Sequence, residues 1–345
     1  MRIPKIKTFF LLFFFSSGYL FASSVTDSGI VHKKSLVTGG IQRLLVSVSD
    51  MEISLSFYRD IAGFQLIAEA QIPKEITDAL WGLPERASAR SIILQKDSQP
   101  TLLELIEFQS QSGKAIRENA GLKDFGLYDI TFMVEDTVKQ YQELKKKGFV
   151  FAAHNIQYPP GLFPFDVKES ILIGPDGVPI THMQMLGSEK TSIPGIYSSI
   201  KASTQVVESM KDAIRFYRDI LGMELRSEVS LPKGLLDEPF FLPKGTEAKM
   251  AFLNRVGSEY AMLAILELTA KGSFLSERSV PPNTGLFMIA FETENMSVLI
   301  NRLKEHSIKF LAGPVVRDLD PYGKISAVHI EGPSGIKIEL FERLR

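Results

Sequence analysis

The sequence predicts an α+β protein made of four βαβββ units that are arranged as two tandem repeats. The first observation is that residues 54–74 return as residues 213–233, including the shared run Phe-Tyr-Arg-Asp-Ile. The second is that residues 126–132 also return, as residues 285–291. The third is that each half of a repeat shows the same order of patterns, a strand, a helix and three further strands. A repeat of this length indicates one domain used twice.

The N-terminal repeat contains two such units. Asp50 is the expected N-cap of the first helix, which carries Ile53, Phe57 and Ile61 on one face and ends at Gly63. The strands of this unit are expected near 43–48, 64–70, 90–96 and 101–108. The second unit has a helix from about residue 137 to 148. Its strands are expected near 129–134, 150–156, 168–173 and 178–186.

The C-terminal repeat has the same two units. Ser209 is expected to cap the helix of the third unit, which Gly222 ends, and Asn295 is expected to cap the helix of the fourth. The later strands of the third unit are expected near 223–229, 248–254 and 260–268. Those of the fourth unit are expected near 308–316, 324–331 and 336–342.

The N-terminus differs from the rest of the chain. Residues 1–22 combine basic residues, a short apolar run and small residues near Ala22, the pattern of a secretory signal peptide. The alternative, a retained membrane anchor, would need a longer apolar run. We expect export to the periplasm or the medium, and no membrane contact after cleavage. The predicted organisation is a signal peptide at 1–22, an unpacked leader at 23–38, a first domain at 39–187, a linker at 188–194 and a second domain at 195–345.

Composition limits the possible partners. The formal net charge is −1, and no basic stripe interleaved with aromatic residues is present, so we expect no nucleic acid partner. The chain contains no cysteine, which excludes disulfides, thiolate ligands and a thiol nucleophile. The length of 345 residues suits two domains. Because the pairing of units is already internal, we expect a monomer.

Two motifs resemble those of a known superfamily. Residues 57–64 and 216–223 resemble the Phe-Tyr-x-x-x-Leu-Gly-Phe signature of the vicinal oxygen chelate (VOC) superfamily, and 174–177 and 332–340 resemble its Asp-Pro-x-Gly-x-x-Ile-Glu-Leu ending. This group contains glyoxalase I, extradiol dioxygenases, and fosfomycin and bleomycin resistance proteins. The resemblance implies two tandem domains, each a curved mixed sheet around a concave cavity, with helices outside and one cavity per repeat.

The resemblance also implies where a metal would bind. Metal-binding members place His, Glu, His and Glu on the first, fourth, fifth and eighth strands of a domain. These positions fall on Arg43, Glu104, Asp129 and Thr181 in the N-terminal repeat, and on about Ala202, Glu267, Met288 and Glu339 in the C-terminal repeat. None is a histidine, methionine is a poor ligand for a hard divalent ion, and arginine would repel one. We therefore expect no cofactor, and a divalent metal is only the alternative.

Several of these residues could still bind a ligand. Strand alternation is expected to place Glu267 and Glu339 on the concave side, with Lys337 as a partner of Glu339. These two carboxylates are the best catalytic candidates, although an ion pair at the cavity mouth explains them slightly better than a ligand role does. Arg43 could hold an anionic ligand, or it could simply neutralise Glu104 and Asp129.

Trp81 and Phe240 occupy matching places on the loops that are expected after the second strand of each repeat, and either could close a cavity or pack the repeats together. Of the five histidines, His154 and His329 could edge a cavity, while alternation turns His182 away from it.

The leading functional hypothesis is an exported protein that binds a small, partly apolar organic ligand without a superfamily-type metal site. The second is a metal-dependent lyase of the glyoxalase type or a dioxygenase of the extradiol type, with a rearranged site at Glu267 and Glu339. The third is a non-catalytic scaffold whose cavities are filled by side chains. A cavity above roughly 300 Å3 would exclude the scaffold.

Overall fold

The four expected βαβββ units are present in the computed structural model, which describes residues 35–83, 87–109, 113–187, 193, 195–255 and 257–344. The predicted signal peptide, most of the leader and most of the linker lie outside the described residues. The first unit consists of β1 (Arg43–Ser47), α1 (Met51–Tyr58), β2 (Gln65–Ile72), α2 (Lys74–Trp81), β3 (Ala89–Gln95) and β4 (Leu102–Phe108). The second consists of β5 (Gly126–Leu127), β6 (Ile130–Met133), α3 (Thr137–Lys146), β7 (Val150–Gln157), β8 (Asp166–Ile173), η1 (Pro175–Gly177) and β9 (Pro179–Leu186).

The C-terminal units repeat this order. The third consists of β10 (Ile200–Val207), α4 (Met210–Ile214), its wider continuation η2 (Arg215–Ile220), β11 (Glu224–Leu231), β12 (Ala248–Asn254) and β13 (Met262–Leu268). The fourth consists of β14 (Gly285–Glu292), α5 (Met296–Glu305), β15 (Phe310–Asp318), β16 (Lys324–Glu331), η3 (Pro333–Gly335) and β17 (Lys337–Arg343). The fold class predicted from the sequence is confirmed.

Capping residues in the sequence predicted the starts of α1, α4 and α5 correctly. The side chains of Asp50, Ser209 and Asn295 each accept a hydrogen bond from the first turn of α1, α4 and α5, as N-caps do. The prediction that Ile53 lies on the buried face of α1 is wrong, because this residue is 61% exposed. Helix α2 was also missed, since its segment was expected to be a loop.

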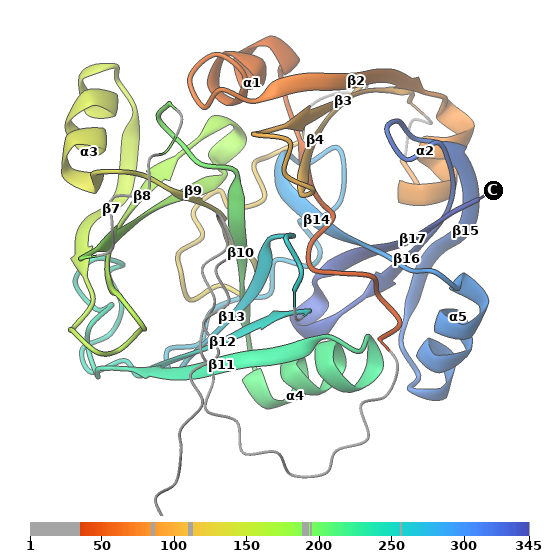
Figure 1. Ribbon diagram of the computed structural model, residues 1–345. Helices are drawn as coiled ribbons and strands as arrows, with labels where there is room; N and C mark the ends of the chain where they lie inside the picture. The colour runs from red at the N-terminus through yellow and green to blue at the C-terminus, as the bar shows by residue number, and fades with distance from the viewer. Residues whose placement is uncertain are drawn as a thin grey trace, which may run out of the picture.

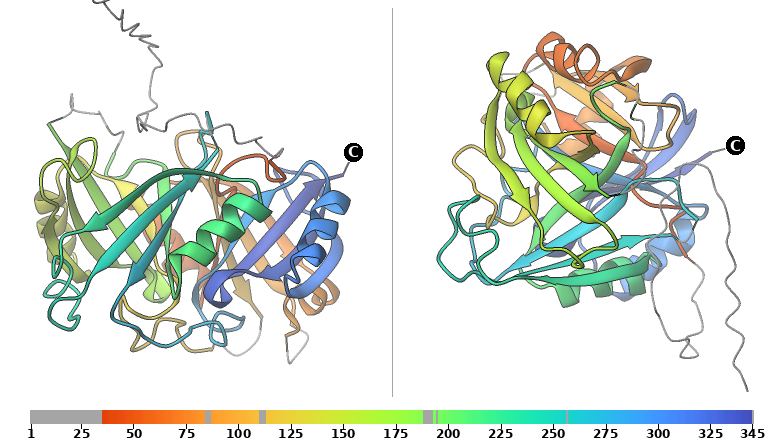
Figure 2. Two further views of the ribbon diagram at one scale, coloured as in Figure 1. Left: turned by 90° about the horizontal axis from the view of Figure 1, so that it is seen from below. Right: turned by 60° about the vertical axis from the view of Figure 1, so that its left-hand side comes forward.

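Each sheet is assembled from units of both repeats. The first sheet has the order β15-β16-β17-β14-β1-β4-β3-β2, and the second has the order β11-β12-β13-β10-β6-β9-β8-β7. Antiparallel pairing of β1 with β14, and of β6 with β10, joins the units. The expectation of one cavity per repeat is therefore wrong, because the outer units share one sheet and the inner units share the other. Figures 1 and 2 show two curved sheets side by side.

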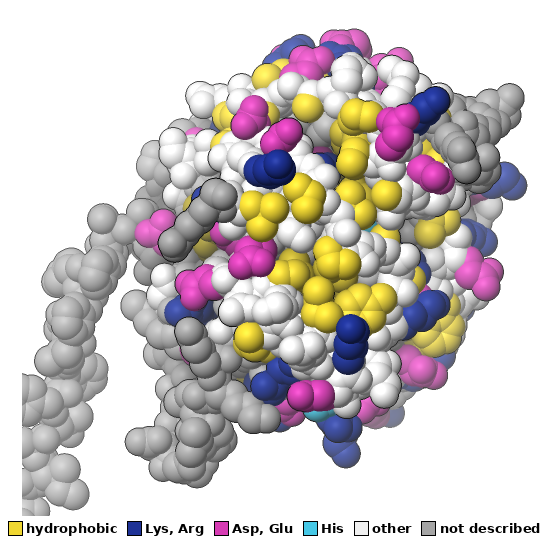
Figure 3. Space-filling model, turned by 90° about the vertical axis from the view of Figure 1, so that its right-hand side faces the viewer, with side chains coloured by type: hydrophobic (Ala, Val, Ile, Leu, Met, Phe, Trp, Pro, Cys, Tyr) yellow, Lys and Arg dark blue, Asp and Glu magenta, His cyan; other side chains and the backbone are white. Residues whose placement is uncertain are grey.

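The apolar core is divided in the same way. One cluster of buried side chains joins the helices to the convex faces and contains residues of both sheets. A second cluster fills the concave side of the first sheet, and a third lines the concave side of the second sheet. Helix α2 lies over the concave side of the first sheet and contacts β15 (Figure 1). The face of the molecule on this side carries apolar side chains mixed with charges of both signs (Figure 3).

The end of the predicted leader is packed against the domains. Val37 is 2% exposed, and the backbone N–H groups of Leu36 and Thr38 donate to the carbonyls of Leu221 and Glu292. The expectation that residues up to 38 are unpacked is wrong for 35–38, because these residues bridge the third and fourth units. No helix within the described residues is long and apolar enough to cross a membrane.

Candidate functional site

The concave side of the first sheet (the first cavity) is filled by side chains, which include a buried network of charges. Arg43 on β1 hydrogen-bonds Glu339 on β17, and its Nε lies 3.4 Å from Oε2 of Glu104 on β4. Arg317 on β15 lies 3.4 Å from Glu339 and 4.0 Å from Glu104. Arg43, Glu104 and Glu339 have no solvent-exposed surface. Two guanidinium groups therefore neutralise two carboxylates away from water, which is the arrangement that buried charges require.

His329 on β16 completes this network. Its Nε2 lies 3.0 Å from Oε2 of Glu339, and its Nδ1 lies 3.0 Å from the carbonyl oxygen of Leu80 on α2. Burial favours the neutral acid of Glu339, but Arg43, Arg317 and His329 together outweigh it and hold the pKa of Glu339 well below its usual value. Glu339 is thus a permanent anion at neutral pH.

Trp81 covers the first cavity. Its ring packs on Phe108 of the first unit and Phe287 of the fourth, at centroid distances of 5.4 and 6.4 Å. The His329 ring lies 5.8 Å away, and the Arg317 guanidinium lies 6.0 Å from the Trp81 ring. Trp81 therefore has both of the predicted roles, because it covers the first cavity and joins the two repeats.

Two predicted contacts of this cavity are wrong. Lys337 donates to Glu331, at 2.9 Å, and not to Glu339. Asp129 lies on the other sheet, so it cannot neutralise Arg43. Met288, which was placed at a ligand position, is buried in the apolar cluster of this cavity. An anionic ligand could reach Arg43 only if one of its two carboxylate partners moved away.

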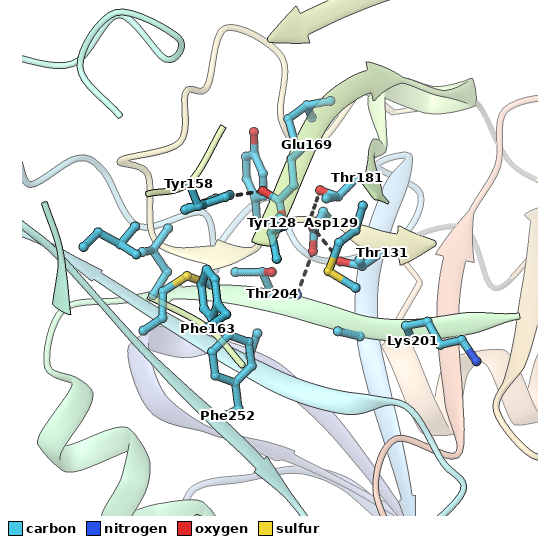
Figure 4. Close-up of a pocket in the computed structure, with 18 of the residues that line it drawn as sticks. Tyr128, Asp129, Thr131, Tyr158, Phe163, Glu169, Thr181, Lys201, Thr204 and Phe252 are labelled. Carbon is cyan, nitrogen blue, oxygen red and sulfur yellow. Dashed lines mark hydrogen bonds between the residues drawn. The ribbon is translucent and has the colours of Figure 1, made fainter. Parts of the chain in front are cut away.

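The second cavity, on the concave side of the second sheet, is open in part and holds about 100 Å3 (Figure 4). Its walls are mostly apolar and aromatic, with a few polar side chains among them. The polar side chains that line it are Tyr128, Asp129, Thr131, Tyr158, Glu169, Thr181, Lys201 and Thr204. Apolar walls with a few convergent polar groups are the usual form of a small-molecule site.

Asp129, just before β6, is held by three neighbouring strands. Its Oδ1 accepts a 2.7 Å hydrogen bond from the backbone N–H of Thr204, and its Oδ2 accepts from Thr181 and, at 3.4 Å, from Thr131. Burial raises the pKa of Asp129, while these hydrogen bonds oppose the shift. Thr181 therefore orients the carboxylate of Asp129 in the cavity wall.

Glu169 on β8 is the second carboxylate of this cavity. Its Oε2 accepts a 2.8 Å hydrogen bond from the hydroxyl of Tyr158. Burial raises the pKa of Glu169 to about 7, the Tyr158 bond opposes this, and the charge of Asp129 adds to it. Its remaining surface faces the cavity, because Glu169 is one of the lining residues. A carboxyl that titrates near neutral pH in an apolar cavity marks a candidate functional site.

Glu267 does not face either cavity, which overturns its predicted role. Its Oε2 accepts a 2.6 Å hydrogen bond from the backbone N–H of Met210, the first residue of α4. Glu107 on β4 accepts the same bond from Met51 of α1, at 3.0 Å. The alternation on β13 was assigned in the wrong phase, because Ala264 and Leu266 line the cavity. Glu267 and Glu339 thus belong to different sheets and cannot form one site.

The remaining candidates fall as follows. Phe240 lines the second cavity, and its ring lies 6.5 Å from that of Tyr128. Ala202 also lines this cavity. His182 points away from it, as predicted, and its Nε2 lies 2.8 Å from the Tyr197 hydroxyl. His154 stacks on Tyr141 outside the cavity.

Sequence reasoning missed Glu169 and Arg317. Both could have been found from alternation, since Val167 and Ile171 flank Glu169 on the buried face of β8, and Arg317 follows Val315 on the same face of β15. Tyr158 has no such signal, because it lies in a loop and its role depends on the path of that loop.

The architecture defines a class of protein in which paired βαβββ units form curved sheets around concave cavities. The profile of the Glyoxalase/Bleomycin resistance protein/Dioxygenase superfamily matches residues 40–181 and 199–340, and the chain belongs to this superfamily. No curated protein matches the sequence.

Solved structures show the same fold. A variant of glyoxalase I from Zea mays is 16% identical, with a TM-score of 0.58 over 89% of this chain and 94% of that chain. The glyoxalase I of Zea mays itself is 15% identical, with a TM-score of 0.56 over 89% and 93%. A putative dioxygenase from Bacillus subtilis is 11% identical, with a TM-score of 0.56 over 91% and 87%.

The residues at the family's metal positions do not fit a divalent ion. By sheet, the predicted positions are Arg43, Glu104, Met288 and Glu339 in the first cavity, and Asp129, Thr181 and Ala202 in the second. Ala264 takes the place that was predicted for Glu267, because it lies two residues beyond the strand partner of Ala202, as Glu104 lies two residues beyond the strand partner of Arg43. In the first cavity a guanidinium already binds both carboxylates, and it would repel a metal ion. Of the metal positions in the second cavity, only Asp129 carries a carboxylate, where the family uses several strong ligands. Within the described residues, no group of three or more His, Asp or Glu could hold a metal.

Proposed function

We propose that this protein binds a small, partly apolar organic molecule in the second cavity, without a metal of the superfamily type. The observation that carries the proposal is the lining of that cavity, in which aromatic and aliphatic side chains surround Asp129 and Glu169. The first cavity supports a structural role, because its charges bind one another and Trp81 covers them.

The second cavity, at about 100 Å3, suits the head of a small molecule. Sites for drug-sized ligands span roughly 300–1,000 Å3. A larger ligand would have to displace flexible lining side chains such as Met183 and Met250. The competing hypothesis is a scaffold that binds nothing, since the cavity does not reach the lower end of that range. A binding experiment separates the two hypotheses.

Filling the second cavity is expected to abolish binding. Ala264 is 2% exposed and lines the cavity from the middle of β13, so Ala264→Met places a long side chain in it. Saturation-transfer NMR with benzyl alcohol and benzylamine as probes should show binding of at least one probe to the protein. Ala264→Met should remove this signal, and addition of a chelator should leave it unchanged.

The matched control is Lys249→Met, which introduces the same side chain on the exposed face of the neighbouring strand β12. This variant should bind the probes as the unchanged protein does. Absence of binding by either probe, or equal binding by Ala264→Met, would support the scaffold. Loss of binding on chelation would contradict a metal-free site.

We further propose that the protein is exported and acts as a monomer. The basic, apolar and small-residue pattern of residues 1–22 supports export. The pairing of all four units within one chain supports the monomer. Sequencing the N-terminus of the mature protein tests the first point, and a start near Ala22–Ser24 is expected.

A further inference from the structure

We propose that the ligand of the second cavity is an organic ammonium ion, whose charged head binds beside Glu169 within the aromatic wall. This inference rests on the proposed function and specifies the chemistry of the ligand. Three features of the cavity support it: the charge of its polar groups, the aromatic residues around them, and the position of its lysine.

The polar end of the cavity has an excess of acidic groups. Asp129 and Glu169 both line it, and the charge of Asp129 contributes to the raised pKa of Glu169. Asp129 is fully engaged by its three hydrogen bonds, whereas Glu169 accepts one bond, from Tyr158 to Oε2. Within the described part of the chain, Oε1 of Glu169 has no donor. A cation in the cavity would supply the missing partner, because a buried carboxylate requires a counter-ion.

Aromatic rings surround these carboxylates. Six aromatic side chains line the cavity: Tyr128, Tyr158, Phe163, Phe165, Phe240 and Phe252. Successive rings are in contact, with Tyr158 and Phe163 at a centroid distance of 5.4 Å, and Phe163 and Phe252 at 6.3 Å. Aromatic faces attract cations, and cages of this kind bind alkylated ammonium groups. Figure 4 shows Tyr128 and Tyr158 beside Glu169, and Phe163 and Phe252 further along the cavity, beyond Thr204.

The basic groups near the cavity do not cancel this preference. Lys201 lines the opposite end and points away from Glu169 (Figure 4). Arg117 lies 4.9 Å from the centroid of the Tyr128 ring, and its guanidinium donates to the carbonyl oxygens of Leu127 and Gly121. The tyrosine hydroxyls of the cavity are neutral, because burial raises the pKa of Tyr128 and of Tyr158. A negative site at Glu169 therefore remains for the ligand.

The proposal is tested with a charged probe and its neutral isostere. Choline carries a permanent positive charge, and its carbon isostere has a tert-butyl group in place of the trimethylammonium group. Isothermal titration calorimetry should show choline binding about tenfold more tightly than the isostere, a difference that a desolvated cation–π contact with a counter-ion can supply. Choline does not titrate, so a rise in its affinity from about pH 6 to about pH 8 would report ionisation of the protein's own carboxyls.

Glu169→Gln keeps the shape of the side chain and removes its charge. This variant should lose the preference for choline and keep its affinity for the neutral isostere. Glu228→Gln, on the exposed part of β11, changes the net charge equally and should leave the preference intact. Equal binding of the two probes by the unchanged protein would overturn the ammonium proposal alone. Binding of neither probe would overturn the proposed function with it.

Discussion

Replacement of Arg43 by Met is expected to lower the free energy of unfolding by about 3–5 kcal/mol, the usual cost of removing one partner of a buried ion pair. Arg43 has no exposed surface and binds both Glu104 and Glu339, so its loss leaves two carboxylates in the core with Arg317 as their remaining guanidinium. Urea unfolding at neutral pH measures the change. The control is Arg59→Met, which removes an exposed pair with Asp60 and should change stability by less than about 0.5 kcal/mol.

A second substitution should restore part of this loss. In the double variant Arg43→Met with Glu339→Gln, one positive and one negative charge are removed together, and the cluster regains balance. The folded-state pKa of Glu339 is depressed, so its contribution is present above the pKa of an unfolded Glu, about 4.3, and is lost as the pH falls. The difference between Arg43→Met and the unchanged protein should therefore shrink in acid. A loss that is independent of pH and not restored by Glu339→Gln would contradict an electrostatic origin.

Replacement of Glu169 by Gln is expected to make the protein more stable at pH 8. The pKa of Glu169 is raised to about 7 by burial, so the folded state holds a proton that the unfolded state has already released. The contribution of Glu169 to the free energy of unfolding is fully present below the unfolded pKa of about 4.3, and it declines as the pH rises towards 7. Between pKa values of about 4.3 and about 7, at 1.36 kcal/mol per pH unit, the total decline is about 3.7 kcal/mol. Gln does not titrate, so the variant avoids the decline.

The free energies of unfolding of Glu169→Gln and of the unchanged protein, measured in urea from about pH 4 to about pH 8, should coincide at the acidic end and separate as the pH rises. Equal stability of Glu169→Gln and the unchanged protein at pH 8 would contradict the raised pKa of Glu169. A carboxyl that destabilises the free protein, in a cavity whose lining could easily be apolar, is the kind of group that proteins keep for binding or catalysis. A bound cation should reverse the effect, because it stabilises the ionised form.

In the first cavity, the positions that the superfamily resemblance assigns to a metal belong to the buried core. Two of them are the carboxylates Glu104 and Glu339, and the guanidinium of Arg43 lies between them. The arginine supplies the positive charge that would otherwise come from the ion, and it brings its own hydrogen bonds. Trp81 and His329 then enclose the cluster.

The sequence by itself determined the units and the chemistry of the metal positions. Helix caps such as Asp50 and Ser209, and the alternation of strands, are local signals, so they could be identified without tertiary structure. The absence of histidine from all eight metal positions is likewise a property of the chain alone.

Tertiary structure decided which units share a cavity. Pairing of β1 with β14 and of β6 with β10 brings Arg43 to Glu339 and separates it from Asp129, and it assigns Glu169 and Asp129 to one site. The sequence repeat could not predict which units pair, because similar units have similar edge strands and either pairing forms the same kind of backbone hydrogen bonds. The face of β13 on which Glu267 lies was also predicted wrongly, because a shift of one residue along a strand moves a side chain to the opposite face.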